Sequence, residues 1–404
     1  MPFQLARVVE ALENAKLLVG TRGALPDTVE GVSDDSRSAR EGSLFIAVRG
    51  SVLDGHDYLS AAESKGSTVA MIEDAERTTL PAIIVREGRK AAAVAAGAAL
   101  GVPSRELRMI GVTGTNGKST TAGILRHLLD QPGARSASIG TLGVLLGSQA
   151  DVVPGGTELT TPGPVELQRV LRELVNRGVR TVSMEVSSHS LDQRRIDGLA
   201  FDAAVFTNLT RDHLDYHHTM EAYFQAKARL MDYLKADGEA AINVDDASWQ
   251  RLPDSRRKIF FGEGARADVR ATQVKFSPSG SEWLLNYERQ TIPVRLPLIG
   301  DVNVHNALGA VAVGLTLGME LEALAGGLSN LPQVPGRLEV ISRRPTVLRD
   351  YAHTPDAIER ALAAIRPFTG GRIILVFGCG GDRDRGKRPE MGRAAEGGAD
   401  LVII

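Results

Sequence analysis

The sequence predicts an α/β fold with a doubly wound parallel sheet at its centre, and two observations lead to this prediction. From residue 107 onward, apolar runs alternate with helical patterns; the runs are residues 107–113, 136–140, 179–186 and 201–209. Parallel sheets that helices cover on both faces show this alternation. In addition, residues 109–129, "MIGVTGTNGKSTTAGILRHLL", join an apolar strand, a glycine-rich turn and a helix. Turns of this kind often bind phosphate groups.

Composition limits the possible classes of protein. The chain has 404 residues, of which 43% are hydrophobic, and a formal net charge of −2. The length allows two or three domains, and the near-neutral charge without a long basic run gives no reason to expect a nucleic-acid partner. The longest apolar run, residues 91–100, is too short to span a bilayer, so we expect no membrane segment. The N-terminus shows helical periodicity rather than a signal peptide, which predicts a cytoplasmic protein.

We expect three domains along the chain: residues 1–107, 108–336 and 337–404. The further elements predicted are strands at 42–50, 67–73 and 81–87, helices at 58–66, 91–100, 164–178, 303–318 and 321–331, and a β-rich stretch at 257–299. The third domain follows a proline-containing linker and ends on the strand-like "ADLVII". Because it is short for an autonomous doubly wound domain, we expect this domain to be incomplete and the chain to be a fragment.

The glycine-rich turn contains the groups that a phosphate site needs. Gly114 and Gly117 allow tight backbone conformations that direct N–H groups at phosphate oxygens. Lys118 supplies a charge for the β- and γ-phosphates, and Ser119 supplies a hydroxyl for Mg²⁺. The regular phosphate-loop pattern has a glycine six residues before the lysine, but Val112 occupies that position. A glycine turn without a ligand is the alternative, and the strand–turn–helix context favours a nucleotide.

Five further segments offer functional groups, each with a plainer alternative. Glu185 ends a predicted strand, where a carboxylate suits a phosphate-bound cation or is simply solvated. His213 lies in the histidine-rich "FTNLTRDHLDYHH", as a ligand or as a surface residue. Lys227 lies in the helical pattern of residues 220–234, where its composition indicates no more than a solvated lysine. The loops "RDYAHTPDA" and "VFGCGGDRDRGKRPEM" concentrate charges, which bind a carboxylate or phosphate or form a solvated rim.

Together these segments resemble a known family. "TGTNGKST", "MEVSSHSL", "TNLTRDHLDYH", "DYAHTPDA" and "FGCGGDRDRGKRP", in this order, are similar to the Mur ligases. The N-terminal "SDDSRSAREGSLFIAVRG" and "DGHDY" resemble the uridine-binding domain of the members that add a diamino acid. The resemblance covers the whole chain. It implies a three-domain fold with a central ATPase-like parallel sheet and a Rossmann-like C-terminal domain.

The resemblance also implies a reaction. Members of the family use ATP and Mg²⁺ to phosphorylate a carboxylate, and an amine then attacks the acyl phosphate to give an amide, ADP and phosphate. The partners implied here are UDP-N-acetylmuramoyl-L-alanyl-D-glutamate and a diamino acid, with no nucleic acid and no membrane, in the cytoplasm. We expect a monomer. Positioning and charge neutralisation dominate catalysis in such transfers.

Roles for single residues follow from the resemblance. The residues implied to bind ATP are Gly114, Thr115, Asn116, Gly117, Lys118, Ser119 and Thr120 at the phosphates, and Asn306, Arg337 and Asp350 at the adenosine. The residues implied to bind the acyl substrate are Asp34, Ser36, Ser51, Val52 and Leu53 at the uridine end, and Thr160, Thr161, Ser187, Gln193 and Arg195 at the muramoyl-dipeptide and diphosphate. Arg383 is implied to contact the incoming amino acid. The implied metal ligands are Ser119, Glu185, His213 and Lys227, the last as a carbamate, and Lys118 joins Glu185, His213 and Lys227 as the catalytic set.

The diamino acid stays open at this point. The motif that separates meso-diaminopimelate from L-lysine in the family lies beyond residue 404, and we favour meso-diaminopimelate because it is the commoner choice. Folylpolyglutamate and cyanophycin synthetases share the phosphate loop, but the N-terminal uridine motif argues against both. A nucleotide-hydrolysing switch needs the regular loop spacing, which Val112 breaks. A binding module without catalysis is the remaining alternative.

Overall fold

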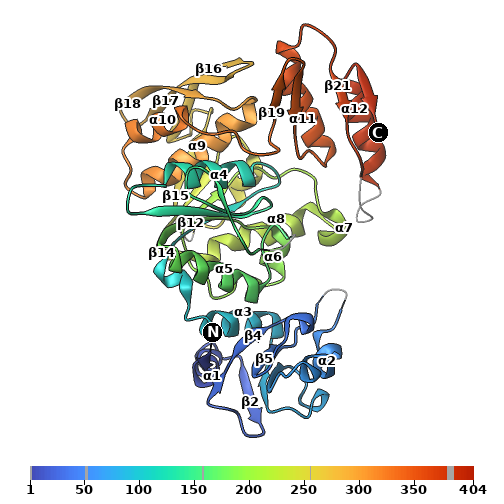
Figure 1. The fold of residues 1–404 in the computed structure, drawn as a ribbon. Coiled ribbons are helices and arrows are strands. Elements are labelled where there is room, and N and C mark those ends of the chain that lie inside the picture. Colours follow the sequence, from blue (N-terminus) through green and yellow to red (C-terminus); the bar gives the residue numbers. More distant parts are fainter. Residues whose placement is uncertain (1, 51–52, 157–158, 255, 380–385) are drawn as a thin grey trace. The chain divides into compact units, whose positions relative to one another are not determined.

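The computed structural model describes the chain except residues 1, 51–52, 157–158, 255 and 380–385 (Figure 1). The chain folds into two compact units whose segments interleave between residues 109 and 200. Unit 1 is Met1–Arg108, Pro154–Arg180 and His189–Ala200; unit 2 is Met109–Val153, Thr181–Ser188 and Phe201–Ile404. The division into three domains stays a prediction.

Unit 1 contains a five-stranded sheet with the order β2-β7-β6-β5-β4. Its strands are β2 (Leu18–Arg22), β4 (Gly31–Ser33), β5 (Ser43–Ile46), β6 (Val69–Ile72) and β7 (Ala82–Val85), and the short strands β1 (Phe3–Gln4) and β3 (Thr28–Val29) pair separately. Its helices are α1 (Leu5–Asn14), α2 (Leu59–Ser64), α3 (Gly88–Ala99), α5 (Pro164–Asn176) and α6 (Ser188–Asp192), of which only the first residue, Ser188, belongs to unit 2. The neighbours from β4 to β7 are parallel, and β2 is antiparallel to β7.

Both faces of this sheet are buried, which explains the continuous apolar runs of its strands. Leu44 and Ile46 of β5 join one buried cluster with α1 and α3, whereas Phe45 between them joins a second cluster with α2. Successive side chains of a strand point to opposite faces, so a strand covered on both faces reads as uninterrupted hydrophobic sequence. The helix predicted at residues 91–100 begins earlier, at Gly88.

Unit 2 is built on a mixed sheet, which the described residues form with the order β11-β10-β9-β12-β8-β13-β14-β15-β16-β17-β18 (Figure 1). Its strands are β8 (Arg108–Thr113), β9 (Arg135–Gly140), β10 (Gly143–Leu146), β11 (Asp151–Val153), β12 (Val179–Glu185), β13 (Phe201–Phe206), β14 (Leu234–Asn243), β15 (Arg257–Gly262), β16 (Val269–Ser277), β17 (Gly280–Tyr287) and β18 (Gln290–Leu296). The pairs from β8 through β13, β14 and β15 to β16 are parallel. The predicted parallel sheet is therefore confirmed at the centre, while hairpins make both margins antiparallel.

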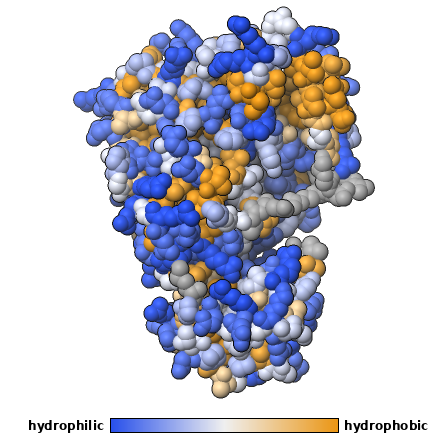
Figure 2. Space-filling view, viewed as in Figure 1, coloured by the Kyte–Doolittle hydropathy of each residue, from blue (hydrophilic) through white to orange (hydrophobic). Residues whose placement is uncertain are grey.

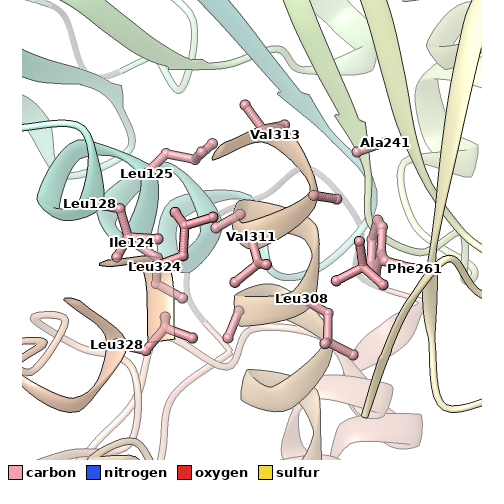
Figure 3. Close-up of a cluster of buried hydrophobic side chains, with 14 of the residues drawn as sticks. Ile124, Leu125, Leu128, Ala241, Phe261, Leu308, Val311, Val313, Leu324 and Leu328 are labelled. Carbon is pink, nitrogen blue, oxygen red and sulfur yellow. The ribbon is translucent and has the colours of Figure 1, made fainter. Parts of the chain in front are cut away.

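Three helices pack together against the sheet and form the main core. These are α4 (Lys118–Leu128), α9 (Asp301–Thr316) and α10 (Leu321–Ser329). Figure 3 shows Leu125 and Leu128 of α4 packed beside α9 and α10, with Phe261 of β15 on the sheet side. All are buried, and each such side chain contributes about 1.5–3 kcal/mol relative to exposure. This packing fixes α4, the helix that starts at the glycine-rich turn.

The helix predicted over residues 220–234 is shorter than expected. Helix α7 (Leu214–His217) precedes it, and α8 runs only over Met220–Ala228. A 3₁₀ turn follows at Arg229–Tyr233, and Leu234 already belongs to β14, where it pairs with Phe201. The apolar spacing of Leu230 and Leu234 arises because both are buried, not because one helix carries them.

The C-terminal segment, residues 337–404, has its own small core. It contains the hairpin β19 (Glu339–Arg343) and β20 (Thr346–Arg349), the parallel pair β21 (Ile374–Val376) and β22 (Leu401–Ile403), and the helices α11 (Pro355–Ile365) and α12 (Lys387–Gly398). Figure 2 shows hydrophobic residues at the surface over the region of β21 and α12, and Ile374 and Val376 are exposed there. Among the described residues, the helices are too short or too polar for any of them to cross a membrane.

Candidate active site

The turn between β8 and α4 requires glycine at two positions. Gly114 has a φ of +149° and Gly117 has a φ of +86°, a region that L side chains rarely adopt. Space is missing as well, because a Cβ on Gly114 would lie 1.9 Å from Thr207 Oγ1 and one on Gly117 would lie 2.2 Å from Asn306 Oδ1. Since α4 begins at Lys118, the unpaired N–H groups of its first turn and its positive dipole end lie at this turn. The arrangement is that of an anion site.

Residues that follow β13 hold the turn in shape. The backbone N–H of Thr115 donates to Asn208 O at 2.8 Å, and that of Asn116 donates to Asn208 Oδ1 at 2.9 Å. The Thr207 hydroxyl donates to Asn116 O at 2.7 Å. Thr115 Oγ1 also lies 3.2 Å from the Tyr223 hydroxyl, whose burial raises the pKa of that phenol and keeps it neutral. The protein itself therefore organises the turn, and a ligand need not do so.

Two lysine amines meet one backbone oxygen of the turn. Lys118 Nζ donates to Gly114 O at 3.0 Å and to Thr115 O at 2.8 Å. Lys227 Nζ, from α8, donates to Gly114 O at 2.7 Å, and Lys227 is only 1% exposed. Its Nζ lies 4.7 Å from the centre of the Tyr223 ring. The interpretation of Lys227 as a solvated lysine is therefore wrong, because its amine is buried beside the glycine-rich turn.

The electrostatic surroundings weaken the charge on Lys227. Burial lowers the pKa of its ammonium well below the ordinary value, and the charge of Lys118 lowers it further, while Asp212 acts in the opposite direction. Burial also lowers the pKa of Lys118, with Glu185 and Asp212 favouring its charged form and Arg337 opposing them. Burial and the charge of Lys118 therefore both favour the neutral form of the Lys227 amine.

Glu185 is a buried carboxylate at the carboxyl end of β12. It is 2% exposed, so the alternative of a solvated strand-end glutamate is wrong. Its Oε1 accepts from the Thr141 backbone N–H at 2.9 Å, and its Oε2 accepts from the Thr141 hydroxyl at 3.2 Å. Gly140 permits this approach, because a Cβ there would lie 2.0 Å from Glu185 Oε1. Glu185 and Ser119 line the same hollow, which places a carboxylate and a hydroxyl, both ligands that Mg²⁺ prefers, beside the start of α4.

His213 lies at the start of α7 with a left-handed backbone, φ +54°. Its Nε2 is 3.3 Å from Asp212 Oδ2, and its ring is 6.1 Å from that of Tyr223. Burial acts to raise the pKa of Asp212, but His213, His353, the hydrogen bond from the His213 backbone N–H and Lys118 together lower that pKa. Within the described parts of the chain, no three His, Cys, Asp or Glu side chains form a group able to hold a metal ion. The role of His213 as a metal ligand stays a prediction.

Two of the residues expected at the adenosine lie against α4. Asn306 of α9 accepts a hydrogen bond from the Thr121 hydroxyl at 3.3 Å. Arg337 Nη2 donates to Ser119 Oγ at 2.8 Å, and its guanidinium lies 5.1 Å from the centre of the Tyr351 ring. Asp350 contacts the residue that follows Arg337, because its carboxylate accepts from the backbone N–H of Leu338 at 2.8 Å. The structure thus brings Asn306 and Arg337 to the helix that starts at the turn, with Arg337 on the hydroxyl expected to bind Mg²⁺.

The residues expected at the uridine end lie on loops of unit 1. Asp34 follows β4, Ser36 begins the short 3₁₀ turn Ser36–Ser38, and Leu53 precedes another 3₁₀ turn and is 62% exposed. Asp35 stabilises the first loop, because its carboxylate accepts from the Arg37 backbone N–H at 2.8 Å. Ser51 and Val52 lie outside the described residues, as does Arg383, the residue expected at the incoming amino acid.

Part of the expected muramoyl-dipeptide group comes together in unit 1. Arg195 Nη1 donates to Thr161 O at 3.1 Å, and Arg195 Nε donates to Gln193 Oε1 at 3.0 Å. Thr160 precedes Thr161 in the same loop before α5, and Ser187 follows β12 in unit 2. Arg195, Gln193 and Thr161 thus form one polar cluster, although Thr161 and Gln193 are 32 positions apart in the sequence.

Sequence reasoning missed the residues that hold the turn, Glu185 and Lys227 in position. Thr207 and Asn208 fix the turn, Thr141 holds Glu185, and Tyr223 packs on Lys227. Asp356, on α11, accepts from Asn116 Nδ2 at 2.9 Å. One signal was available: Thr207 and Asn208 directly follow a buried strand of a parallel sheet, where ligand sites open.

Comparison with known proteins identifies this arrangement. The chain matches the Mur ligase middle domain over residues 112–314, the glutamate ligase domain of Mur ligases over 336–404, and the Mur ligase family catalytic domain over 28–114. The middle-domain match alone spans half of the chain and contains the turn, Glu185 and both lysines. The chain belongs to the Mur ligase family.

Relatives of this Mur ligase include two named UDP-N-acetylmuramoyl-L-alanyl-D-glutamate–2,6-diaminopimelate ligase. The protein of Geobacter metallireducens is 43% identical over 99% of this chain and 78% of its own length. That of Geobacillus thermodenitrificans is 40% identical over 95% of this chain and 79% of its own length. The matches therefore extend through unit 1 as well as through the phosphate-binding turn.

Solved structures confirm the fold. A structure of a UDP-N-acetylmuramoyl-L-alanyl-D-glutamate–2,6-diaminopimelate ligase has a TM-score of 0.76 and 31% identity, covering 100% of this chain and 82% of the other. A MurF ligase from Thermotoga maritima in complex with ADP has a TM-score of 0.65 and 22% identity, covering 92% of this chain and 83% of the other, and supports the fold alone. As a member of the Mur ligase family, the chain is an ATP-dependent ligase.

Proposed function

We propose that this Mur ligase joins a diamino acid, meso-diaminopimelate, to the D-glutamate of UDP-N-acetylmuramoyl-L-alanyl-D-glutamate in peptidoglycan precursor synthesis. In the first step a carboxylate oxygen of the glutamate attacks the γ-phosphorus of ATP, and the bond to ADP breaks. In the second step the amine attacks the carbonyl carbon of the acyl phosphate, loses a proton and expels phosphate. Both relatives described above bear the name of this ligase.

One observation carries the proposal: a preformed phosphate-binding turn with two lysine amines at a single backbone oxygen. The turn is held by Thr207 and Asn208, so its N–H groups are in place before ATP binds. Lys118 would leave its internal hydrogen bonds and place its charge on the transferred phosphate. Preorganised donors of this kind stabilise charge where it develops during phosphoryl transfer.

Asn306, Arg337 and Asp350 would contact the adenosine part of ATP. Arg337 supports this assignment in a modified form, because its guanidinium contacts Ser119 at the start of α4. A guanidinium there would meet the phosphates as well as the nucleoside. Thr120 and Gly117 lie in the same stretch, where the backbone of the first helical turn would face the phosphate oxygens.

Magnesium fits the residues present. Ser119 and Glu185 line one hollow and supply a hydroxyl and a carboxylate, and Mg²⁺ commonly takes one or two protein oxygens together with phosphates and water. Ser119 and Glu185 would therefore hold the ion, with His213 as a further candidate ligand. When bound, the ion neutralises charge on the phosphates during transfer.

Lys227 would act as a carbamate. A neutral amine reacts with carbon dioxide, and burial together with Lys118 lowers the pKa of Lys227 toward that neutral form. The product is an anion, which suits a position between a phosphate-binding turn and a second cation. The hydrogen bond from Nζ to Gly114 O, at 2.7 Å, supports a place for this group next to the transferred phosphate.

The acyl substrate would contact residues of unit 1. Ser36 and Asp34, with residues 51–53, would bind the uridine, and Thr160, Thr161, Gln193 and Arg195, with Ser187, would bind the muramoyl-dipeptide and its diphosphate. The cluster of Arg195, Gln193 and Thr161 supports this assignment, because a guanidinium already oriented by its neighbours is suited to a phosphate or carboxylate. We place the reaction in the cytoplasm, where ATP is available, and keep the expectation of a monomer.

The test is an ADP-release assay with the acyl substrate and either meso-diaminopimelate or L-lysine. We expect release that requires ATP, the UDP-linked dipeptide and meso-diaminopimelate together. Turnover with L-lysine instead would change the amino acid and keep the reaction. ADP release without either acceptor would favour a hydrolysing switch, and turnover with a folate or cyanophycin substrate would move the chain to a related ligase.

A further inference from the structure

We propose that Asp356 is a positioning residue that docks helix α11, and with it the C-terminal segment, onto the tip of the phosphate-binding turn. The inference rests on the proposed function, because the step it serves is attack by the incoming amine. Asp356 would not touch the reacting atoms. It would fix the position of the C-terminal segment after the acyl phosphate has formed and before the amine attacks.

The contact itself is short and oriented. Asn116 Nδ2 donates to Asp356 Oδ2 at 2.9 Å, and the Thr210 hydroxyl lies 3.5 Å from the same oxygen. The other carboxylate oxygen of Asp356 accepts from Arg360 Nε at 2.9 Å, one helical turn further along α11. The Thr354 side chain caps the helix by accepting from the Ala357 backbone N–H at 3.2 Å. The Asp356 carboxylate therefore has a fixed direction before it reaches Asn116.

The conformation of the turn does not depend on this contact, whereas the position of α11 beside the turn does. The backbone of Asn116 is already held on the other side, where its N–H donates to Asn208 Oδ1 and its carbonyl accepts from Thr207 Oγ1. The hydrophobic cluster of α11 consists of C-terminal residues such as Ile358, Leu362 and Met391. It is separate from the cluster that packs α4, α9 and α10. The position of Asn116 is thus fixed by its own neighbours, and the hydrogen bond from Asn116 to Asp356 positions α11 relative to the turn.

The other polar contacts of the C-terminal segment with the site are less suited to this task. Arg337 donates to Ser119, but nucleotide and Mg²⁺ would compete for both partners. Arg211 and Glu390 are 3.9 Å apart, with side chains 73% and 39% exposed, and exposed pairs of this kind contribute little. The amide of Asn116 points at α11 and so leaves the phosphates to the backbone of the turn. The Asn116–Asp356 bond can therefore persist while ATP is bound.

This arrangement predicts that loss of the Asp356 carboxylate affects the nucleotide and the amino acid differently. Removing the Asp356 carboxylate leaves the turn and its bonds to Thr207 and Asn208 intact, so nucleotide binding should change little. The position of the C-terminal segment should become less precise, and the attack of the amine on the acyl phosphate should therefore become slower. Misplacement of a reacting group by about 1 Å can cost about 100-fold in rate, so a measurable loss is expected from one anchoring bond.

The experiment compares Asp356→Ala with Asp356→Asn and with the control Glu359→Gln on the full chain. Glu359 is exposed on the same helix, so its variant removes an equal charge without touching Asn116. We expect Asp356→Ala to lower kcat/KM for meso-diaminopimelate about tenfold, the loss typical of a hydrogen bond to a charged group. Calorimetric affinity for ADP should stay within twofold of the parent. Asp356→Asn keeps an acceptor oxygen and should restore most of the activity, and Glu359→Gln should match the parent.

A double-mutant cycle with Asn116→Ala tests whether Asp356 acts through Asn116. Asp356→Ala should have no further effect on kcat/KM for the amino acid in the Asn116→Ala background. An undiminished further loss, a parent-like Asp356→Ala, or an equal loss of ADP affinity in Asp356→Ala would each overturn the proposal. If Asp356→Ala does not fold, Asn116→Ala alone, which removes the same bond, must show the loss for the amino acid. A parent chain without acceptor-dependent ADP release overturns the proposed function instead, while ADP binding still reports on the turn.

Discussion

The turn after β8 and the loop after β4 both follow strands of a parallel sheet, yet they work differently. In the proposed site the turn after β8 would bind phosphate through its backbone N–H groups. Its conformation requires Gly114 and Gly117, because the neighbours leave no room for a side chain. The loop after β4 is ordered by its own side chains, with Ser33 Oγ 2.7 Å from Ser38 Oγ and Asp35 bonded to Arg37. It requires no special backbone, and Ser36 is only half-buried. We therefore expect the turn after β8 to tolerate substitution less than the loop after β4.

The largest effect that would test this contrast comes from Gly117→Ala. We expect ADP affinity to fall by at least about 100-fold, because the left-handed φ costs about 1–2 kcal/mol and the new Cβ also meets Asn306 Oδ1 at 2.2 Å. Isothermal titration with ADP measures this. Gly133→Ala is the matched control, since Gly133 has a φ of +79° with nothing within 4 Å of a Cβ, and its ADP affinity should stay within twofold. Parent-like binding by Gly117→Ala would remove the steric argument.

The next effect concerns Lys227→Ala. Loss of the group proposed to carry a carbamate should lower ligase activity by about 100-fold, in the range that positioned catalytic groups provide. A short-chain carboxylic acid that fills the space should restore part of it, as followed by ADP release. Lys235→Ala, which removes a half-exposed lysine paired with Asp202, should keep full activity. Full activity of Lys227→Ala without added acid would rule out the carbamate.

A smaller effect is expected on stability. The folded-state pKa of Lys227 is lowered, so between that value and the ordinary value of about 10.4 the unfolded chain binds more protons. Stability from this group is therefore low at low pH and rises as the pH approaches about 10.4. Lys227→Met removes this slope, so its free energy of unfolding relative to the parent should fall as the pH rises toward about 10.4. Urea unfolding in carbonate-free buffer measures it, and a constant difference would contradict the lowered pKa.

The smallest effect is expected in the loop after β4. Ser36→Ala should raise KM for the UDP-linked dipeptide about fivefold, the cost of one hydrogen bond of about 1 kcal/mol, and leave KM for ATP within twofold. Ser60→Ala, on the exposed face of α2, serves as control and should change neither constant. An equal rise of both constants in Ser36→Ala would place Ser36 outside the uridine site and weaken the contrast between the two loops.

Much of the fold could be predicted because its signals are local. Strands β8, β12 and β13 and helices α4 and α5 lie where apolar runs and helical periodicity placed them. The end of α8 could not be predicted, because Leu234 leaves the helical pattern to pair with Phe201, which is distant in the sequence. The antiparallel margins of the large sheet have the same cause, since pairing partners decide strand direction.

The site divides in the same way. Lys118, Ser119 and the two glycines are visible in one stretch of sequence, because backbone geometry imposes the glycines. Lys227 was indistinguishable from a surface lysine in composition, and only the resemblance to relatives pointed to it. Its burial against Gly114 and Tyr223 results from packing between α8 and the turn, which no local pattern contains.

The sequence by itself predicted the α/β class and the glycine-rich turn, because these depend on periodicity and on glycines in fixed positions. Its motifs also resembled those of the Mur ligases, and the comparisons confirmed membership of that family. Only the tertiary structure decided that Glu185 is buried against Thr141, that Lys227 shares Gly114 O with Lys118, and that Asn116 reaches Asp356. These contacts join residues 44, 113 and 240 positions apart. Burial and charge then set the pKa values and hydrogen bonds on which the chemistry depends, and both are properties of the folded surroundings rather than of the residue type.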